Sequence, residues 1–349
     1  MTNITEAPVE SAPALRTWLR DFVYEARGAL SEQLLPVVRW LAEKQRLRCI
    51  LGAVCADSEL VQRAGAQSYI HINGFDKLVL LSEPDVFKLR LHIWWGDNAA
   101  LSKETIHNHR WDFAAHIVTG AYRAEEFERA DAGAPFREYR YYSPEADGQF
   151  GYEECGPARL RTASDRLVAA GTGYFLSHEV LHRVSQDMPT LTASLVLQGP
   201  TMKRYTNSLL DRPVRLDGHA VPSPRRLSGA EMADRCGRFL NRLDGKNDAP
   251  ERAPQARMSL ARDVLRGYAG QYRHEGSHPF ALEIEAVEEH LRVCADLLPR
   301  PFDLYPSSPV DFFFDNIDVR LHFVMGQGGA VQGVNVRFPS FESFAKRVG

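Results

Sequence analysis

Two patterns of apolar residues follow one another along this chain. Over residues 14–59 apolar side chains recur at helical spacing, which predicts a helical start. From Tyr69 onward the period changes to two. In residues 87–94 an apolar face alternates with a mixed face, and this alternation predicts a strand. One face holds Phe87, Leu89, Leu91 and Ile93, and the other holds Lys88, Arg90, His92 and Trp94.

Further strand-like runs follow, separated by Gly, Pro and Asp, without a helical pattern between them. Such a succession is typical of an antiparallel sandwich or barrel rather than of a parallel sheet with crossover helices. These strands are predicted at residues 116–127, 136–142, 159–161, 173–176, 182–185 and 191–198.

A helix and a linker follow this first β-rich part. Residues 228–243 predict one helix, with Ser228 as N-cap and Glu231 in the capping-box position. Residues 244–255 are rich in Asp, Pro, Lys and Arg and lack an apolar period, which predicts a linker. A second β-rich part opens at residues 260–272. Its strands are predicted at 281–284, 291–294, 302–305, 311–314, 319–325 and 331–336, with a hairpin turn at 326–329.

The chain of 349 residues is long enough for two domains, at roughly 150 residues per domain. The fold class expected from the strand pattern is mainly β, with helices at the N-terminus. The boundaries that the patterns predict are a helical lead-in at 1–66, a first β-rich domain at 67–227, a helix and linker at 228–257, and a second, smaller β-rich domain at 258–349.

Charge and cysteine content narrow the function classes. The 42 basic and 45 acidic residues nearly cancel and form no basic stripe, so small molecules are favoured as partners over nucleic acid or a membrane. Residues 1–13 lack a basic start followed by an apolar stretch, and no run of about eighteen apolar residues occurs, which predicts a cytoplasmic protein. Five scattered cysteines without a Cys-x-x-Cys pair indicate reduced thiols.

The strongest candidate for chemistry is the segment His107-Asn108-His109. Residues two apart on a strand point the same way, so both imidazoles can reach one metal ion, and His182 can supply a third from another strand. Three neutral imidazoles leave coordination positions open for water, O2 or a chelating substrate. The alternative is a pair of solvated strand histidines.

Three further choices stay open at this stage. His178 competes with His182 as the third ligand, and one residue of strand register decides whether His116 faces the interior. The face with Arg90 and Trp94 is either solvated or lines the interior, since Trp is costly to leave in water. If it points inward, Arg90 suits a substrate carboxylate better than Lys77 does, because its planar fork binds both oxygens.

The pattern of histidines and glycines resembles the two sequence motifs of the cupin superfamily over about residues 69–205. The glutamate that many cupins carry after the second histidine is absent here, so the chain is closest to cupins with three histidine ligands. The local sequence is similar to that of the cysteine dioxygenase-like thiol dioxygenases. This resemblance implies a jelly-roll barrel behind N-terminal helices and a bound Fe(II). It is carried by His107-x-His109, Gly120, Gly171-x-Gly173, His182, and the stretches 87–91, 95–96, 181–184 and 194–200.

The sequence departs from that family where substrate is recognised. The strand that carries Ser, His and Tyr at alternate positions in the family reads Ser194, Val196 and Gln198 here. Lys77 falls where the family has the arginine for the substrate carboxylate, and residues 113–114 fall where it has the cysteine cross-linked to tyrosine. The resemblance therefore supports oxygen chemistry but does not single out cysteine as substrate.

The C-terminal region, about residues 261–348, resembles the small lipocalin-like barrel that often follows penicillin-recognising serine hydrolase domains. No Ser-x-x-Lys hydrolase domain precedes it here, so we expect an accessory barrel that serves packing or the formation of a homodimer. The resemblance is carried by residues 265–272, 291–293, 312–314 and 345–348.

Together these observations predict a mononuclear non-haem iron dioxygenase or oxygenase. Fe(II) held by His107, His109 and His182 would act with O2 on a small metal-chelating anion, such as a thiol or an amino-acid derivative. The alternatives are a small-molecule-binding or sensor cupin without oxygenase activity, and a metal-dependent isomerase. The side chains expected to contact the substrate are Lys77, Arg90, His92, Trp94, Phe113 and Gln198.

Overall fold

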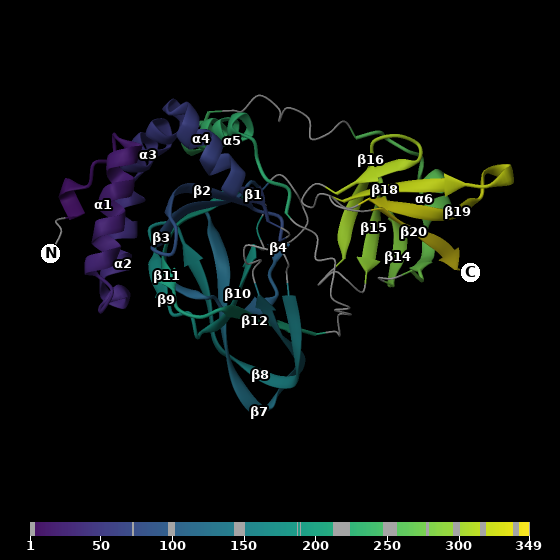
Figure 1. Cartoon of the computed structure of the whole chain (residues 1–349), viewed down its shortest axis with the longest axis horizontal. Coiled ribbons are helices and arrows are strands. Elements are labelled where there is room, and N and C mark those ends of the chain that lie inside the picture. The colour runs from purple at the N-terminus through teal and green to yellow at the C-terminus, as the bar shows by residue number, and fades with distance from the viewer. Residues whose placement is uncertain are drawn as a thin grey trace. The chain divides into compact units, whose positions relative to one another are not determined.

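The computed structural model describes most of the chain and divides it into two compact units (Figure 1). One unit holds helices α1 to α5 and most of strands β1 to β12, and the other holds helix α6 and strands β13 to β20. The described residues are 4–71, 73–96, 102–142, 151–186, 188, 190–211, 224–246, 257–276, 279–295, 301–314, 319–337 and 342–348.

The helical start predicted for residues 14–59 is confirmed as a series of helices that continues to Gln67. The predicted capping box is also present: the Ser228 side chain accepts from the Glu231 backbone, and the Glu231 side chain accepts from the Ser228 backbone. The helices of this unit are η1 (Ile4–Glu6), α1 (Ala12–Glu25), α2 (Leu30–Leu41), α3 (Lys44–Ala56), α4 (Ser58–Gln67) and α5 (Gly229–Leu243).

The first sheet has six strands, and all its neighbours are antiparallel. The strands predicted at 87–94 and 173–176 are found with those bounds. In spatial order the strands are β1 (Tyr69–Ile70), β2 (Asp76–Glu83), β3 (Phe87–Trp94), β11 (Thr192–Thr201), β6 (Trp111–Thr119) and β9 (Gly173–Leu176).

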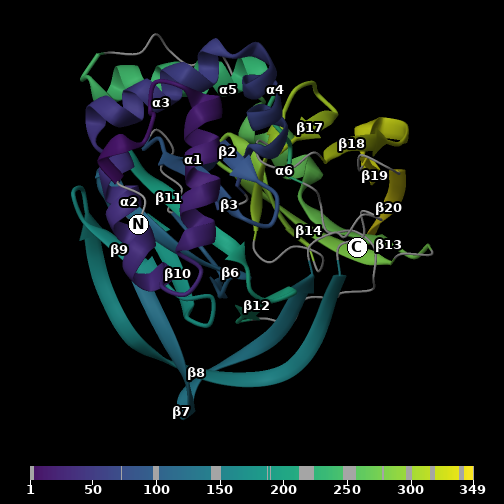
Figure 2. The same cartoon turned by 60° about the vertical axis from the view of Figure 1, so that its left-hand side comes forward.

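The second sheet contains two strands much longer than the sequence predicted. The predicted strand 116–127 is in fact divided at Gly120, whose φ of +71° ends β6, and the chain then continues as one strand through residues 128–135. Figures 1 and 2 show β7 and β8 reaching beyond the other strands. The order is β4 (Ser102–Lys103), β10 (Leu181–Gln186), β5 (Ile106–His107), β12 (Tyr205–Leu210), β7 (Ala121–Tyr142) and β8 (Gly151–Ala169).

The two faces of the first sheet are buried against different partners. Leu89 and Leu91 point to the helices and share an apolar cluster with Leu15 of α1, and Figure 2 shows α1 and α2 lying over this sheet. The opposite face packs on the second sheet, where Trp94 contacts Tyr122 of β7. Each buried leucine contributes about 1.5–3 kcal/mol, so the helix layer fixes which residues of β3 face the interior.

The second unit is a closed barrel of eight antiparallel strands in sequence order. Residues 260–272, which the sequence placed at the start of the β-rich part, contain helix α6 (Arg262–Tyr268) before the first strand, because Leu265 and Tyr268 are buried one turn apart. The hairpin turn at 326–329 is found as η2 (Gln327–Gly329). The strands are β13 (Gly270–His274), β14 (Phe280–Val287), β15 (His290–Ala295), β16 (Phe302–Pro306), β17 (Asp311–Phe313), β18 (Arg320–Met325), β19 (Val331–Arg337) and β20 (Glu342–Val348).

The predicted class, mainly β with N-terminal helices, a two-sheet barrel and a small closed barrel, is confirmed. Cys236 is buried and Cys155 is exposed, and the other three cysteines are half-buried. Within the described ranges no helix is both long enough and apolar enough to cross a bilayer. Of the predicted linker, residues 247–255 lie outside the described residues.

Gly120 and Gly171 both have a positive φ but differ in how closely neighbouring residues approach them. A Cβ at Gly120 would collide with the Leu191 carbonyl and Thr192, whereas a Cβ at Gly171, with a φ of +84°, would meet nothing within 4 Å. We expect Gly171→Ala to cost about 1–2 kcal/mol from backbone conformation alone, and Gly120→Ala to cost clearly more. Denaturant unfolding measures both. Equal losses would show that the close approach at Gly120 does not constrain the fold.

Candidate metal centre

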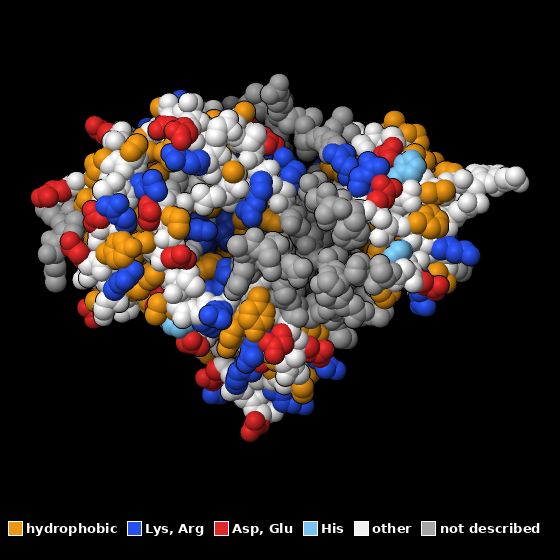
Figure 3. Space-filling model, in the orientation of Figure 1, with side chains coloured by type: hydrophobic (Ala, Val, Ile, Leu, Met, Phe, Trp, Pro, Cys, Tyr) orange, Lys and Arg blue, Asp and Glu red, His pale blue; other side chains and the backbone are white. Residues whose placement is uncertain are grey.

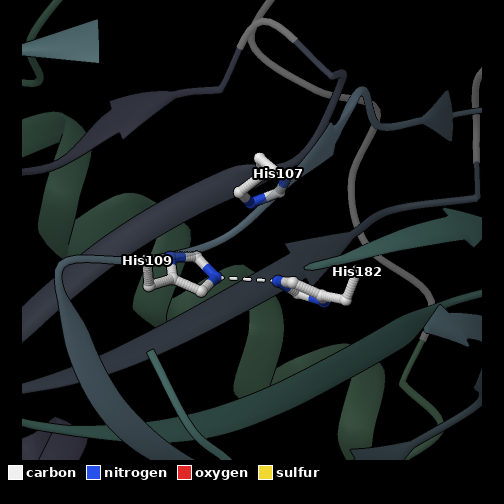
Figure 4. A group of neighbouring side chains, drawn as sticks. All are labelled: His107, His109 and His182. Carbon is white, nitrogen blue, oxygen red and sulfur yellow. Dashed lines mark hydrogen bonds between the residues drawn. The ribbon is translucent and has the colours of Figure 1, made fainter. Parts of the chain in front are cut away.

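The three predicted histidines come together between the two sheets (Figure 4). His107 is the last residue of β5, and its register partner on the neighbouring strand β10 is His182. Because partners in a ladder point to the same side, these two imidazoles share the inner face. His109 lies beyond the end of β5, so the alternation that the sequence suggested does not position it.

The position of His109 depends on a clamp between two asparagines that the sequence did not reveal. The buried side chain of Asn108 donates to Asn207 Oδ1 over 3.0 Å and accepts from the Asn207 backbone N–H over 2.7 Å. The Asn108 backbone N–H donates to the Asn207 carbonyl over 3.1 Å. Three hydrogen bonds thus hold the residue between the two histidines to β12, which fixes both neighbours.

The imidazole nitrogens converge on one point. His109 Nε2 lies 2.8 Å from His182 Nε2, and one ligand atom from each of the three residues lies within 4.8 Å of the others. Two nitrogens at right angles on one metal, each about 2.0–2.1 Å from it, are about 3 Å apart. The donor set therefore fits a single transition-metal ion.

A backbone carbonyl orients His107. Its Nδ1 lies 2.8 Å from the Thr105 carbonyl oxygen, which can only accept, so Nδ1 donates this hydrogen bond and Nε2 is the nitrogen available to a metal. A second hydrogen bond of this kind fixes the tautomer and the ring orientation of metal-binding histidines.

Burial keeps the other two imidazoles neutral. It lowers the pKa of His109 well below its usual value of 6.5, with His107 and His182 adding to the shift. Burial, followed by His107, likewise lowers the pKa of His182. Metal ligands must be deprotonated, so a site whose histidines resist protonation is prepared for a cation.

Aromatic side chains enclose one side of the centre. Phe113, predicted to line the site, lies edge-on to His109 with ring centroids 5.0 Å apart. Trp111, which the sequence analysis missed, stacks on His109 with centroids 5.8 Å apart. These rings exclude water from one side of the histidine group.

The other residues predicted to contact substrate share the inner face of the first sheet. His92 is the register partner of Lys77 on β2 and of Ser194 on β11, and Gln198 is the partner of Phe113. Arg90 is 5% exposed, so the solvated alternative for this face is wrong. Polar atoms of three of these side chains are buried without a partner, namely Arg90 Nε, His92 Nε2 and Gln198 Oε1.

Trp94 lies on the same inner face but in an apolar cluster. Its ring centroid is 4.6 Å from that of Phe75 and 5.5 Å from that of Tyr122. The Tyr122 and Tyr174 hydroxyls are 2.9 Å apart, and Tyr122 also hydrogen-bonds to Ser194. Burial raises the pKa of Tyr174 to about 12, so this network of hydroxyls stays protonated at neutral pH.

Two rival histidines lie elsewhere. His178 Nδ1 is 2.6 Å from Asp112 Oδ1, and its Nε2 is 2.9 Å from Glu179. His116 is the register partner of Leu195, a member of the cluster beneath the helices, so it faces away from the interior. Neither belongs to the histidine group.

No family of known proteins matches this sequence, and no curated protein matches it. Solved structures are similar over part of the chain. An RmlC-like cupin from Shewanella frigidimarina NCIMB 400 is 14% identical with a TM-score of 0.24, over 39% of this chain and 87% of that chain. Hydroquinone 1,2-dioxygenase from Sphingomonas sp. TTNP3 is 11% identical with a TM-score of 0.22, over 36% and 65%. An oxalate oxidase is 10% identical with a TM-score of 0.24, over 46% and 65%.

The chain thus spans less than two thirds of the length of the last two proteins.

Each histidine of the group is expected to be needed for metal binding. His107→Ala, His109→Ala and His182→Ala should each lose most of the bound metal, because two neutral ligands chelate poorly, and His178→Ala should keep it. Metal analysis of the purified variants measures this. Full metal occupancy in His182→Ala would contradict the assignment.

Stability of the metal-free protein should fall in mild acid. Burial lowers the pKa of His92, His109 and His182 well below 6.5, so below about pH 6.5 the unfolded chain binds more protons than the folded protein. Each such histidine lowers the free energy of unfolding by about 1.4 kcal/mol per pH unit. Urea unfolding between pH 7 and pH 5 tests this, and His92→Asn should make the loss shallower. An unchanged stability over this range would contradict the burial of these groups.

Proposed function

We propose that this chain is a mononuclear non-haem iron oxygenase that uses O2 on a small anionic substrate. The observation that carries the proposal is the convergence of three imidazoles on one point, in the same interior as the buried Arg90 side chain. His107, His109 and His182 would hold the ion. The choice of iron over zinc or nickel rests on the resemblance to the three-histidine thiol dioxygenases.

Bound iron would supply open coordination positions for a chelating substrate and for O2, and a route for electrons from one to the other. Three neutral nitrogens from His107, His109 and His182 would leave the ion its full positive charge, which would favour an anionic donor such as a thiolate, enolate or carboxylate. Phe113 and Trp111 exclude water from one side, and the Thr105 carbonyl holds His107 in the ligating tautomer.

The polar network supports a substrate other than free cysteine. Where the resembled family has His and Tyr after its serine, this chain has Val196 and Gln198. In this chain the tyrosine hydroxyls come from other strands, because Tyr122 bonds to Ser194 and to Tyr174. Substrate would therefore meet hydroxyl donors in a different arrangement.

The altered network also favours a second candidate, a cupin that binds a small molecule without oxygenase activity.

A small apolar ligand inside the C-terminal barrel is less well supported, because aromatic rings from α6, β13, β17 and β18 pack against one another there. These rings are Tyr268, Tyr272, Phe312 and Phe323. We propose that this barrel is an accessory part without chemistry of its own.

Anaerobic loading with Fe(II), followed by an oxygen-uptake panel of thiols, amino acids, aromatic acids, dicarboxylates and phosphate monoesters, tests the proposal. We expect about one iron per chain and O2 consumption that depends on one class of substrate, with none in the zinc-loaded protein or in His182→Ala. His178→Ala is the matched control and should stay active. Stoichiometric iron without O2 uptake on any member of the panel would favour the binding protein instead.

A further inference from the structure

Four cationic side chains gather near the metal centre. Lys77, Lys88 and Arg90 lie on β2 and β3, and Arg110 immediately precedes β6. In the part of the chain that the structure describes, none of the four forms an ion pair. In Figure 3, Lys and Arg side chains are visible deep in a recess of this unit.

The two arginines share one aromatic ring. The guanidinium carbons of Arg90 and Arg110 lie 5.0 and 5.1 Å from the Trp111 ring centroid, and Trp111 stacks on the metal ligand His109. The Nε atoms of both arginines are buried without a hydrogen-bond partner. Two guanidinium groups with unpaired Nε donors therefore lie against the aromatic ring that stacks on His109.

These charges repel one another in a partly buried recess, where Arg90 is buried and Lys77, Lys88 and Arg110 are half-buried. Burial lowers the pKa of Lys88 to about 8, and Arg90, Lys77 and Arg110 add to that shift. Like charges buried together without counter-ions are costly, and such arrangements are characteristic of functional sites.

Tyr69 offsets part of the charge. Burial raises the pKa of this phenol, but Lys77 and Arg90 outweigh burial and lower it. Its hydroxyl bonds to Lys77, its register partner on β2. Tyr69 also favours the charged form of Arg90, and Glu104 favours that of Lys77, but neither forms an ion pair with Arg90, Arg110 or Lys88 in the part of the chain that the structure describes.

We infer that the substrate carries a doubly charged oxyanion group, a phosphate-like group or a pair of adjacent carboxylates, which Arg90, Arg110 and Lys88 bind beside Trp111. Planar guanidinium forks bind such oxygens in pairs, and the lysine adds a point charge. The identification of this anion as the substrate rests on the proposed function, whereas the anion-binding site itself is inferred from these side chains alone. A thiol or amino acid with a single negative charge would leave the cluster uncompensated.

Calorimetric titration of the metal-loaded full chain at constant ionic strength tests the inference. The probes are inorganic phosphate and malonate, with acetate as the singly charged control. We expect phosphate or malonate to bind at least tenfold more tightly than acetate, and the stronger of the two distinguishes a phosphate-like group from a dicarboxylate.

Variants separate this site from the metal. Arg90→Gln and Arg110→Gln should each weaken binding of the preferred dianion at least tenfold, and Arg90→Lys should weaken it less. Arg166→Gln, which removes a cation paired with Glu126, is the matched control and should bind normally. If Arg90→Gln does not fold, Arg110, which is less buried, carries the test.

Binding should persist in His182→Ala, which removes a metal ligand. Loss of binding in His182→Ala together with normal binding in Arg110→Gln would show that the anion binds the metal, which would overturn the inference. Equal affinity for acetate and for the dianions would also overturn it. Binding of the dianion requires neither iron nor O2. Dianion binding without oxygen uptake would therefore contradict only the proposed function, whereas oxygen uptake without dianion binding would contradict only this inference.

Discussion

The site depends on one constraint, the burial of both faces of the first sheet. Leu89 and Leu91 of β3 are fully buried beneath the helices, which fixes the register of the strand. A slip of one residue would place Arg90 and His92 in that apolar layer without partners, at a cost of several kcal/mol each, which is a large part of the about 5–15 kcal/mol that stabilises most folds. The helical start therefore determines that polar side chains face the interior.

The same burial gives these side chains their chemistry. In a dry interior an imidazole stays neutral and a guanidinium without a counter-ion is costly, so His109 is prepared for a cation and Arg90 for an anion. Trp111 touches both groups and joins the two halves of the site. A ligand that bridged the metal and the arginines would satisfy both requirements together.

Local patterns in the sequence predicted the features that depend on residues close together in the chain. The alternation in β3 and the capping box of α5 were read correctly because each depends on residues a few positions apart. The clamp between Asn108 and Asn207 joins residues 99 apart and leaves no local trace. The facing of His116 stayed open because it depends on register, which a single strand does not reveal. The run through 128–135 continues as β7 because its partner strand β8 is nearly as long.

X-ray absorption at the metal edge of the iron-loaded protein tests the central claim most directly. The geometry of His107, His109 and His182 predicts three imidazole nitrogens on one iron, with oxygen ligands at the remaining positions and no sulfur from the protein. A spectrum with fewer than three imidazoles, or with a cysteine sulfur among the ligands, would contradict the account.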